Sequence, residues 1–282
     1  MRDRSSGGNR QPWNQTNQLI ISSAGRSAID GLNVTIASAA AQAVGYSSFM
    51  DRRRGVGTVV AALLAAGALV AVTGLEGGAQ GTGTITGVVT MNDPPPASTL
   101  AATADQAVCG DTAPNEAIVA DSDGHVANAV VRVTGLAWPD GGPPPTINNV
   151  DCRFVPHVQV ARTRSQLEIT SADDTLHSTH AYDDRNRTDF NIAMPFAGMN
   201  VTRPLRRPGA VRIECDSHKW MRGWVVVSND RGVVSMPDGR FTLDNVPAGT
   251  HEVTIWHETL GAQPQSVTVT AGETTMVEFT LQ

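Results

Sequence analysis

The feature that most constrains this chain is a short loop that carries three soft metal-ligating side chains between two strand-like runs. Cys215, His218 and Met221 follow the spacing Cys-x2-His-x2-Met. The run 210–214 (AVRIE) precedes the loop, and the run 223–227 (GWVVV) follows it. Both runs are rich in β-branched residues, which favour strands. We therefore predict a strand connection that presents a thiolate, an imidazole and a thioether to one ion.

This set of side chains favours copper over zinc. Two histidines and one cysteine in a plane, with a weak axial methionine, form the ligand set of blue-copper electron-transfer sites. Zinc sites normally recruit four Cys and His ligands and do not use methionine. Three unrelated residues on a buried hairpin are the alternative, so a second histidine elsewhere in the chain must decide between these interpretations.

Short strands and turns predominate after residue 80. The chain of 282 residues has 27 Gly and 16 Pro, and runs of Val, Ile and Thr alternate with turn residues. No segment after residue 80 shows a sustained helical period with caps. We therefore predict an all-β fold for residues 80–282.

A hydrophobic run at 56–75 precedes this β part. It has 20 residues without a charge and follows Asp51 and three arginines. Its length suffices for a transmembrane helix, and the arginines would then keep the tail 1–55 in the cytoplasm. The alternative is a secretory signal peptide that begins at Met50 and is cleaved near Gln80, with residues 1–49 upstream of the true start.

Both alternatives place residues 80–282 outside the cytoplasm, in the periplasm or on the outer face of the membrane. The charge of the chain is uneven: the total is −6, residues 1–79 carry +3, and residues 80–282 carry −9. An acidic folded part argues against nucleic acid as a partner. It suits docking on a basic protein surface.

The sequence around the ligand loop resembles a cupredoxin of the amicyanin type. The resemblance is carried by the Cys-x2-His-x2-Met loop and by the pattern Leu-His-x2-His at 176–180. It implies a Greek-key β-sandwich over residues 146–229 that binds copper. His180 is an alternative to His177, or an additional ligand. The copper ligands implied by the resemblance are His177, Cys215, His218 and Met221.

Residues 84–282 as a whole resemble bacterial exported proteins of the methylamine-utilisation or plastocyanin-like type, which carry a carboxypeptidase-regulatory-like domain. This resemblance rests on the segment 149–158 (NVDCRFVPHV) and on the stretch 238–258, which begins DGRF and ends WHE. It implies that 84–137 and 230–282 form one transthyretin-like β-sandwich, into which the cupredoxin-like domain is inserted. Two domains in series are the alternative.

The resemblance implies a type-1 copper protein that carries single electrons to a redox protein or a membrane electron-transfer complex. The outer edge of His218 is then the expected electron port, with an apolar rim formed by Met194, Pro195, Phe196 and Trp220. A non-redox scaffold or docking subunit of a membrane complex, with a vestigial or storage metal site, is the alternative. The common hydrolase, zinc-protease and phosphate-binding motifs are absent from the sequence, so we do not expect an enzyme.

Two cysteines remain once Cys215 is assigned to the metal. A leftover pair in an exported protein usually oxidises, so we predict a disulfide between Cys109 and Cys152, with two free buried thiols as the alternative. His157 and His257 lie outside the expected ligand set. We expect both of them to serve packing or hydrogen bonding.

Overall fold

A computed structural model of the chain describes residues 81–282. The predicted tail at 1–55, including Met50, and the predicted hydrophobic helix or signal segment at 56–75 lie outside the described residues. From residue 81 onwards, no helix is long and apolar enough to cross a membrane. The regular structure of this part is strand apart from one four-residue helix, α1 (Gln106–Cys109), so the all-β prediction is confirmed.

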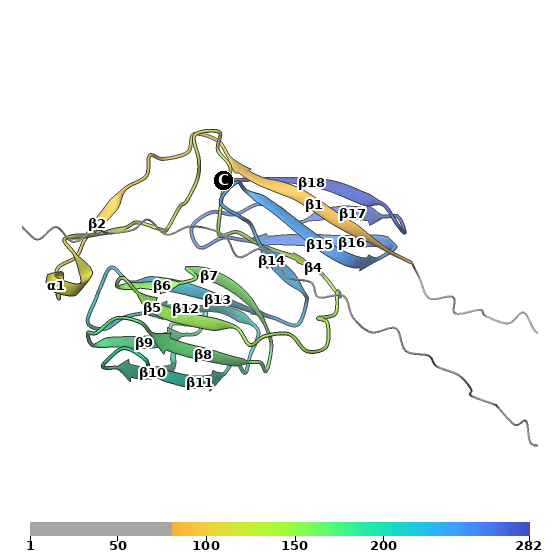
Figure 1. The fold of residues 1–282 in the computed structure, drawn as a ribbon. Helices are drawn as coiled ribbons and strands as arrows, with labels where there is room; N and C mark the ends of the chain where they lie inside the picture. The colour runs from red at the N-terminus through yellow and green to blue at the C-terminus, as the bar shows by residue number, and fades with distance from the viewer. Residues whose placement is uncertain (1–80) are drawn as a thin grey trace, which may run out of the picture. The chain divides into compact units, whose positions relative to one another are not determined.

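The first β-sandwich combines strands from both ends of the described chain (Figure 1). One sheet has the order β15–β1–β18 and the other β14–β4–β16–β17. β1 runs antiparallel to β15 and parallel to β18. The strands of this first sandwich are β1 (Thr82–Met91), β4 (Val130–Val133), β14 (Gly232–Val234), β15 (Arg240–Pro247), β16 (Gly249–Trp256), β17 (Gln265–Val269) and β18 (Thr274–Leu281).

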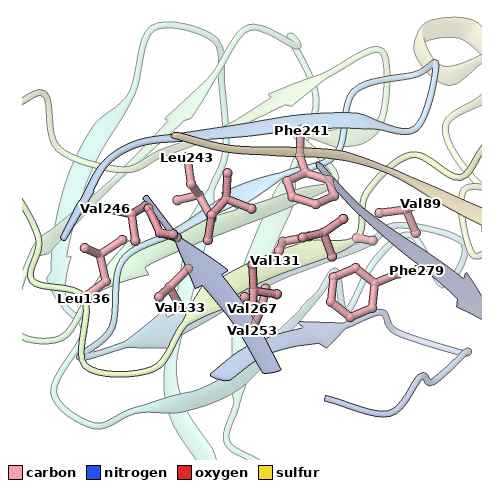
Figure 2. Packing of buried hydrophobic residues seen from close by; sticks show 14 of the residues in the cluster. Val89, Val131, Val133, Leu136, Phe241, Leu243, Val246, Val253, Val267 and Phe279 are labelled. Carbon is pink, nitrogen blue, oxygen red and sulfur yellow. The ribbon is translucent and has the colours of Figure 1, made fainter. Parts of the chain in front are cut away.

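The core of the first sandwich lies between its two sheets. Phe241 and Phe279, whose ring centroids are 6.4 Å apart, pack at one end of the cluster, and Leu136 and Val246 lie at the other (Figure 2). The strand β1 contributes every second residue, because side chains alternate between the faces of a strand. Its threonines at the intervening positions stay partly exposed. The period-two pattern of the sequence therefore sets which face of β1 is buried.

The second β-sandwich is formed by the middle of the chain. Its sheets have the orders β10–β9–β12–β13–β7 and β11–β8–β5–β6. β7 pairs parallel to β13, and β5 pairs parallel to β8. The strands are β5 (Thr146–Val150), β6 (Arg153–Val155), β7 (Val158–Arg162), β8 (Gln166–Ser171), β9 (His177–Tyr182), β10 (Thr188–Met194), β11 (Asn200–Pro204), β12 (Gly209–Glu214) and β13 (Arg222–Ser228).

The core of the second sandwich includes two residues of the ligand loop. Cys215 and Met221 belong to the same buried cluster as Phe154, Leu167 and Ile213. The loop is therefore packed onto the sandwich, and the core holds the side chains of Cys215 and Met221.

A short segment between β1 and β4 leaves the first sandwich. It contains β2 (Thr99–Ala101), α1 and β3 (Thr112–Pro114), with β2 and β3 paired antiparallel. Cys109 at the end of α1 forms a disulfide with Cys152, which lies between β5 and β6 of the second sandwich. We call residues 97–117 the tethered segment. The predicted domain boundaries stay a prediction, although β1 and β4 do share sheets with strands after residue 231.

Gly87 in the middle of β1 generates a stability prediction. It pairs with Phe241 of β15, and a Cβ at Gly87 would lie 1.8 Å from the carbonyl oxygen of Val277 and 2.7 Å from Cζ of Phe241. Because a backbone carbonyl cannot move aside cheaply, Gly87→Ala is expected to lower the free energy of unfolding by about 1–3 kcal/mol. Gly261→Ala is the matched control, since a Cβ there meets nothing within 4 Å. Urea unfolding measures both, and equal stabilities would contradict the packing described for β1.

Candidate metal centre

The ligand loop is a tight connection between two adjacent strands. Glu214 at the end of β12 pairs with Arg222 at the start of β13, and the loop residues lie between them. The backbone N–H of Met221 donates to the carbonyl of His218 over 2.9 Å. The strands and this turn fix the loop, so the side chains at Cys215 and His218 leave it from defined positions.

Three donor side chains converge at this end of the second sandwich. His177 is the first residue of β9, whereas Cys215 and His218 lie on the loop. One donor atom from each of the three lies within 4.8 Å of the other two. The two histidines are fully buried and Cys215 is 1% exposed. Cys215 and His177 thus meet in a site closed to water, although 38 positions separate them in the sequence.

The two imidazoles face each other through the same type of nitrogen. Nδ1 of His177 lies 2.9 Å from Nδ1 of His218, and Sγ of Cys215 lies 3.6 Å from Nδ1 of His218. The two ring planes are inclined by 61°. Both Nδ1 atoms and the sulfur therefore point at a common volume.

The far nitrogen of each ring is bound by a carboxylate. Nε2 of His177 lies 2.9 Å from Oδ2 of Asp173, and Nε2 of His218 lies 2.9 Å from Oδ2 of Asp105. A carboxylate only accepts hydrogen bonds, so each Nε2 carries the proton and donates it. A ring whose single proton is on Nε2 presents an unprotonated Nδ1 to the other ring.

This arrangement fits a bound metal cation. Two Nδ1 lone pairs that face each other at 2.9 Å repel, unless a proton or a metal ion lies between them. Histidine ligands of metals usually donate their other N–H to a carboxylate or a carbonyl, as His177 and His218 do here. A buried cysteine sulfur and two imidazole nitrogens are soft and borderline donors that suit copper. The residues present therefore fit the predicted group.

The sulfur of Cys215 is placed by Ser178. The backbone N–H of Ser178 donates to Sγ over 3.3 Å, and its hydroxyl lies 3.9 Å from Sγ. The same hydroxyl accepts from the backbone N–H of Asp216 over 2.7 Å. These contacts fix the position of the sulfur, which would bind a metal as the thiolate. Ser178 also joins β9 to the loop and so holds the two sides of the site together.

Burial sets the charge state of the upstream histidine. Burial lowers the pKa of His177 and the neighbouring His218 lowers it further, whereas Asp173 raises it. A lowered pKa keeps the ring neutral near pH 7, as metal binding requires. The hydrogen bond from His218 is the main cause of the lowered pKa of Asp105, which therefore stays ionised and accepting.

The other predicted site residues lie as follows. Met221 is 2% exposed and packs in the same core as Cys215. His180 is not part of the cluster, because it differs from His177 by an odd number of strand positions and so points to the other face of β9. Its ring lies 3.0 Å from Oδ1 of Asp216 and 2.8 Å from the hydroxyl of Thr188.

The expected electron port at the edge of His218 is wrong. The ring is fully buried, Asp105 binds its Nε2, and Sγ of Cys109 lies 3.9 Å from the same nitrogen. The predicted apolar rim is wrong at Met194, which is fully buried, while Phe196 is 56% exposed. The physical reason is the tethered segment, which covers the side of the loop that a simple sandwich would leave open.

The remaining predicted residues have structural contacts. Cys109 and Cys152 are joined, so the sulfur of Cys152 is not free for a metal. The two ring nitrogens of His157 contact the carboxylate of Glu258 and the backbone carbonyl of Arg222. His257 is 6% exposed and accepts from backbone N–H groups two and three residues later. His157 and Glu258 are contributed by different sandwiches and connect them.

Sequence reasoning did not find the two carboxylates of this centre. The position of Asp173 in the sequence could have indicated its role, because it precedes His177 by four residues. A metal-bound histidine commonly has a carboxylate partner. Nothing in the sequence indicated the role of Asp105, because it lies 113 residues before His218 in a segment without a recognisable strand or ligand motif. The predicted disulfide between Cys109 and Cys152 connected the segment that contains Asp105 to the second sandwich.

Comparison with protein families identifies one part of the chain. Residues 224–282 match the family model of the carboxypeptidase regulatory-like domain. The predicted resemblance to a carboxypeptidase-regulatory-like domain is confirmed over these residues. The segment contains β14 to β18, the strands that supply most of the first sandwich, and it begins within β13 of the second. No curated protein matches the chain in sequence.

Several solved structures that resemble part of the chain are copper proteins by their descriptions. A copper-containing nitrite reductase from Thermus scotoductus SA-01 is 19% identical over 34% of this chain, with a TM-score of 0.27, and the match spans a quarter (25%) of that chain. A purple cupredoxin from Nitrosopumilus maritimus is 19% identical over 30% of this chain and 99% of its own, with a TM-score of 0.27. Amicyanin from Paracoccus versutus is 14% identical over 35% of this chain and 97% of its own, with a TM-score of 0.28.

Asp173 generates a prediction for the metal-free protein. Its carboxylate accepts from Nε2 of His177 and, over 2.8 Å each, from the backbone N–H groups of Asp151 and Cys152. Because an amide would turn a donor toward one of these groups, Asp173→Asn is expected to cost about 1.5–3 kcal/mol of unfolding free energy. Asp174→Asn changes the charge equally at an exposed neighbour and should change stability little. A stable Asp173→Asn variant would show that these bonds do not hold the site.

Proposed function

We propose that this protein is a type-1 copper protein that carries single electrons, rather than an enzyme. The observation that carries the proposal is the pair of Nδ1 atoms at 2.9 Å, with Sγ of Cys215 beside them and a carboxylate behind each ring. His177, His218 and Cys215 would hold the copper ion, with Met221 as a further ligand. Copper held there would supply reversible one-electron chemistry.

The chain's own residues would keep such a centre rigid and dry. Asp173 fixes the ring of His177 through the loop before β9, and Ser178 fixes the sulfur of Cys215 from β9 itself. Each ligand is almost fully buried, so water cannot replace it easily. A site whose ligands are already in place needs little rearrangement when the charge on the metal changes. This property suits an electron carrier better than a site for substrate binding.

We propose that the protein works on the outer face of the cytoplasmic membrane, with a redox protein or a membrane electron-transfer complex as its partner. The disulfide between Cys109 and Cys152 supports this placement, because such bonds persist in oxidising compartments. The charged and hydrophobic sequence at 51–75 supports export or anchoring there. The excess of acidic residues after residue 80 supports a partner with a basic surface.

Addition of copper(II) to the purified full-length chain tests the proposal. We expect an intense visible absorption from charge transfer between the Cys215 thiolate and copper, which a reductant such as ascorbate bleaches. Cys215→Ser is expected to abolish the absorption because it removes the thiolate. Ser217→Ala, an exposed change on the same loop, is the control and should leave the absorption intact. A colourless parent protein with a titratable Cys215 thiol would contradict the proposal and favour the non-redox scaffold.

The same spectrum distinguishes the two candidate upstream histidines. His177→Ala is expected to remove the absorption or change it strongly, because the ring supplies one of the facing Nδ1 atoms. His180→Ala should leave the spectrum close to that of the parent, since its ring binds Asp216 and Thr188. The reverse result would assign the ligand to His180.

A further inference from the structure

The tethered segment reaches the metal centre from outside the second sandwich. Its residues lie between β1 and β4, two strands of the first sandwich. Two contacts hold it against the centre: the disulfide from Cys109 to Cys152, and the hydrogen bond of 2.9 Å between His218 Nε2 and Asp105 Oδ2. These two anchors are four residues apart, at the two ends of α1.

His218 and the carboxylate that binds it differ in their exposure to solvent. The His218 ring is fully buried, with the ring of Trp220 at a centroid distance of 4.9 Å and Sγ of Cys109 at 3.9 Å from Nε2. The side chain of Asp105 is 48% exposed. The negative charge is therefore solvated from outside while it binds a ring to which water has no access.

The side chain of Asp105 does not cap the helix that it precedes. It is the N-cap residue of α1, where aspartate normally accepts a hydrogen bond from the first turn. Its side chain makes no such bond, and its backbone adopts the left-handed conformation with φ 48°. The carboxylate is directed to His218 instead.

From these contacts we infer that Asp105 is a positioning residue of the metal centre, which acts through His218 and is held in place by the Cys109–Cys152 disulfide. This inference rests on the proposed function. The carboxylate fixes the tautomer of His218, so that Nδ1 is free for the metal, and it fixes the orientation of the ring. It also adds a negative charge behind a ligand, which stabilises copper(II) more than copper(I).

The metal-binding test compares Asp105→Asn with the parent chain. Loss of the carboxylate is expected to weaken copper(II) binding by about 10–100-fold. Copper(I) binding should weaken less, because its charge is lower. The reduction potential should consequently rise, by about 59 mV for each tenfold difference between the two losses. Competition with a chelator measures the affinities, and spectroelectrochemistry measures the potential.

Asp111→Asn is the matched control for the charge. Asp111 is exposed on the same tethered segment, so the variant removes the same charge from that segment without touching His218. Equal affinities and potentials for the two variants would overturn the inference while leaving the proposed function intact. A parent chain that binds no copper would overturn the proposed function itself.

A readout without metal tests the positioning directly. Nitrogen NMR of the metal-free chain should show His218 as the Nε2–H tautomer in the parent and in Asp111→Asn. In Asp105→Asn the preference should weaken, because an amide can donate as well as accept. A His218 tautomer that does not change in Asp105→Asn would contradict the inference.

The role of the disulfide is tested by a double-mutant cycle. Cys109→Ala with Cys152→Ala removes the tether and leaves no free thiol to bind copper. If the disulfide holds Asp105 in place, Asp105→Asn should weaken copper(II) binding much less in this background than in the parent. An equally large effect in both backgrounds would show that Asp105 reaches His218 without the disulfide.

Discussion

The structure of the centre depends on two imidazole nitrogens that face each other at 2.9 Å. Two unprotonated Nδ1 atoms in this orientation repel each other. The orientation is held because a carboxylate accepts a hydrogen bond from Nε2 on the far side of each ring. Asp173 precedes β9 and fixes the ring of His177. Asp105 comes from the tethered segment and fixes the ring of His218. A cation bound between the two Nδ1 atoms would remove this repulsion.

The surrounding fold keeps these groups at their distances. His177 starts β9, which pairs with β12, and the ligand loop leaves β12 and returns in β13. Cys215 and Met221 pack in the hydrophobic core of the second sandwich, so a displacement of the loop would open a cavity in that core. The first sandwich contributes through the tethered segment. The tethered segment, which follows β1 of the first sandwich in the chain, thus completes the environment of His218.

Local sequence patterns predicted the parts of this structure that depend on local interactions. Runs of valine, isoleucine and threonine between turn residues predicted the all-β fold, and the spacing of Cys215 and His218 predicted a loop whose two side chains meet. The contact with His177 required the resemblance to a cupredoxin, because 38 residues separate it from Cys215. The binding of Asp105 to His218 could not be predicted, since it depends on how a patternless segment folds across another sandwich. The buried edge of His218 was mispredicted for the same reason.

X-ray absorption at the copper edge of the copper-loaded full-length chain tests the central claim most directly. The account predicts one copper per chain, with one short bond to sulfur and two bonds to imidazole nitrogen in the first coordination shell. A shell without sulfur, or one made only of nitrogen and oxygen, would contradict the assignment of Cys215 and of the facing histidines as the metal centre.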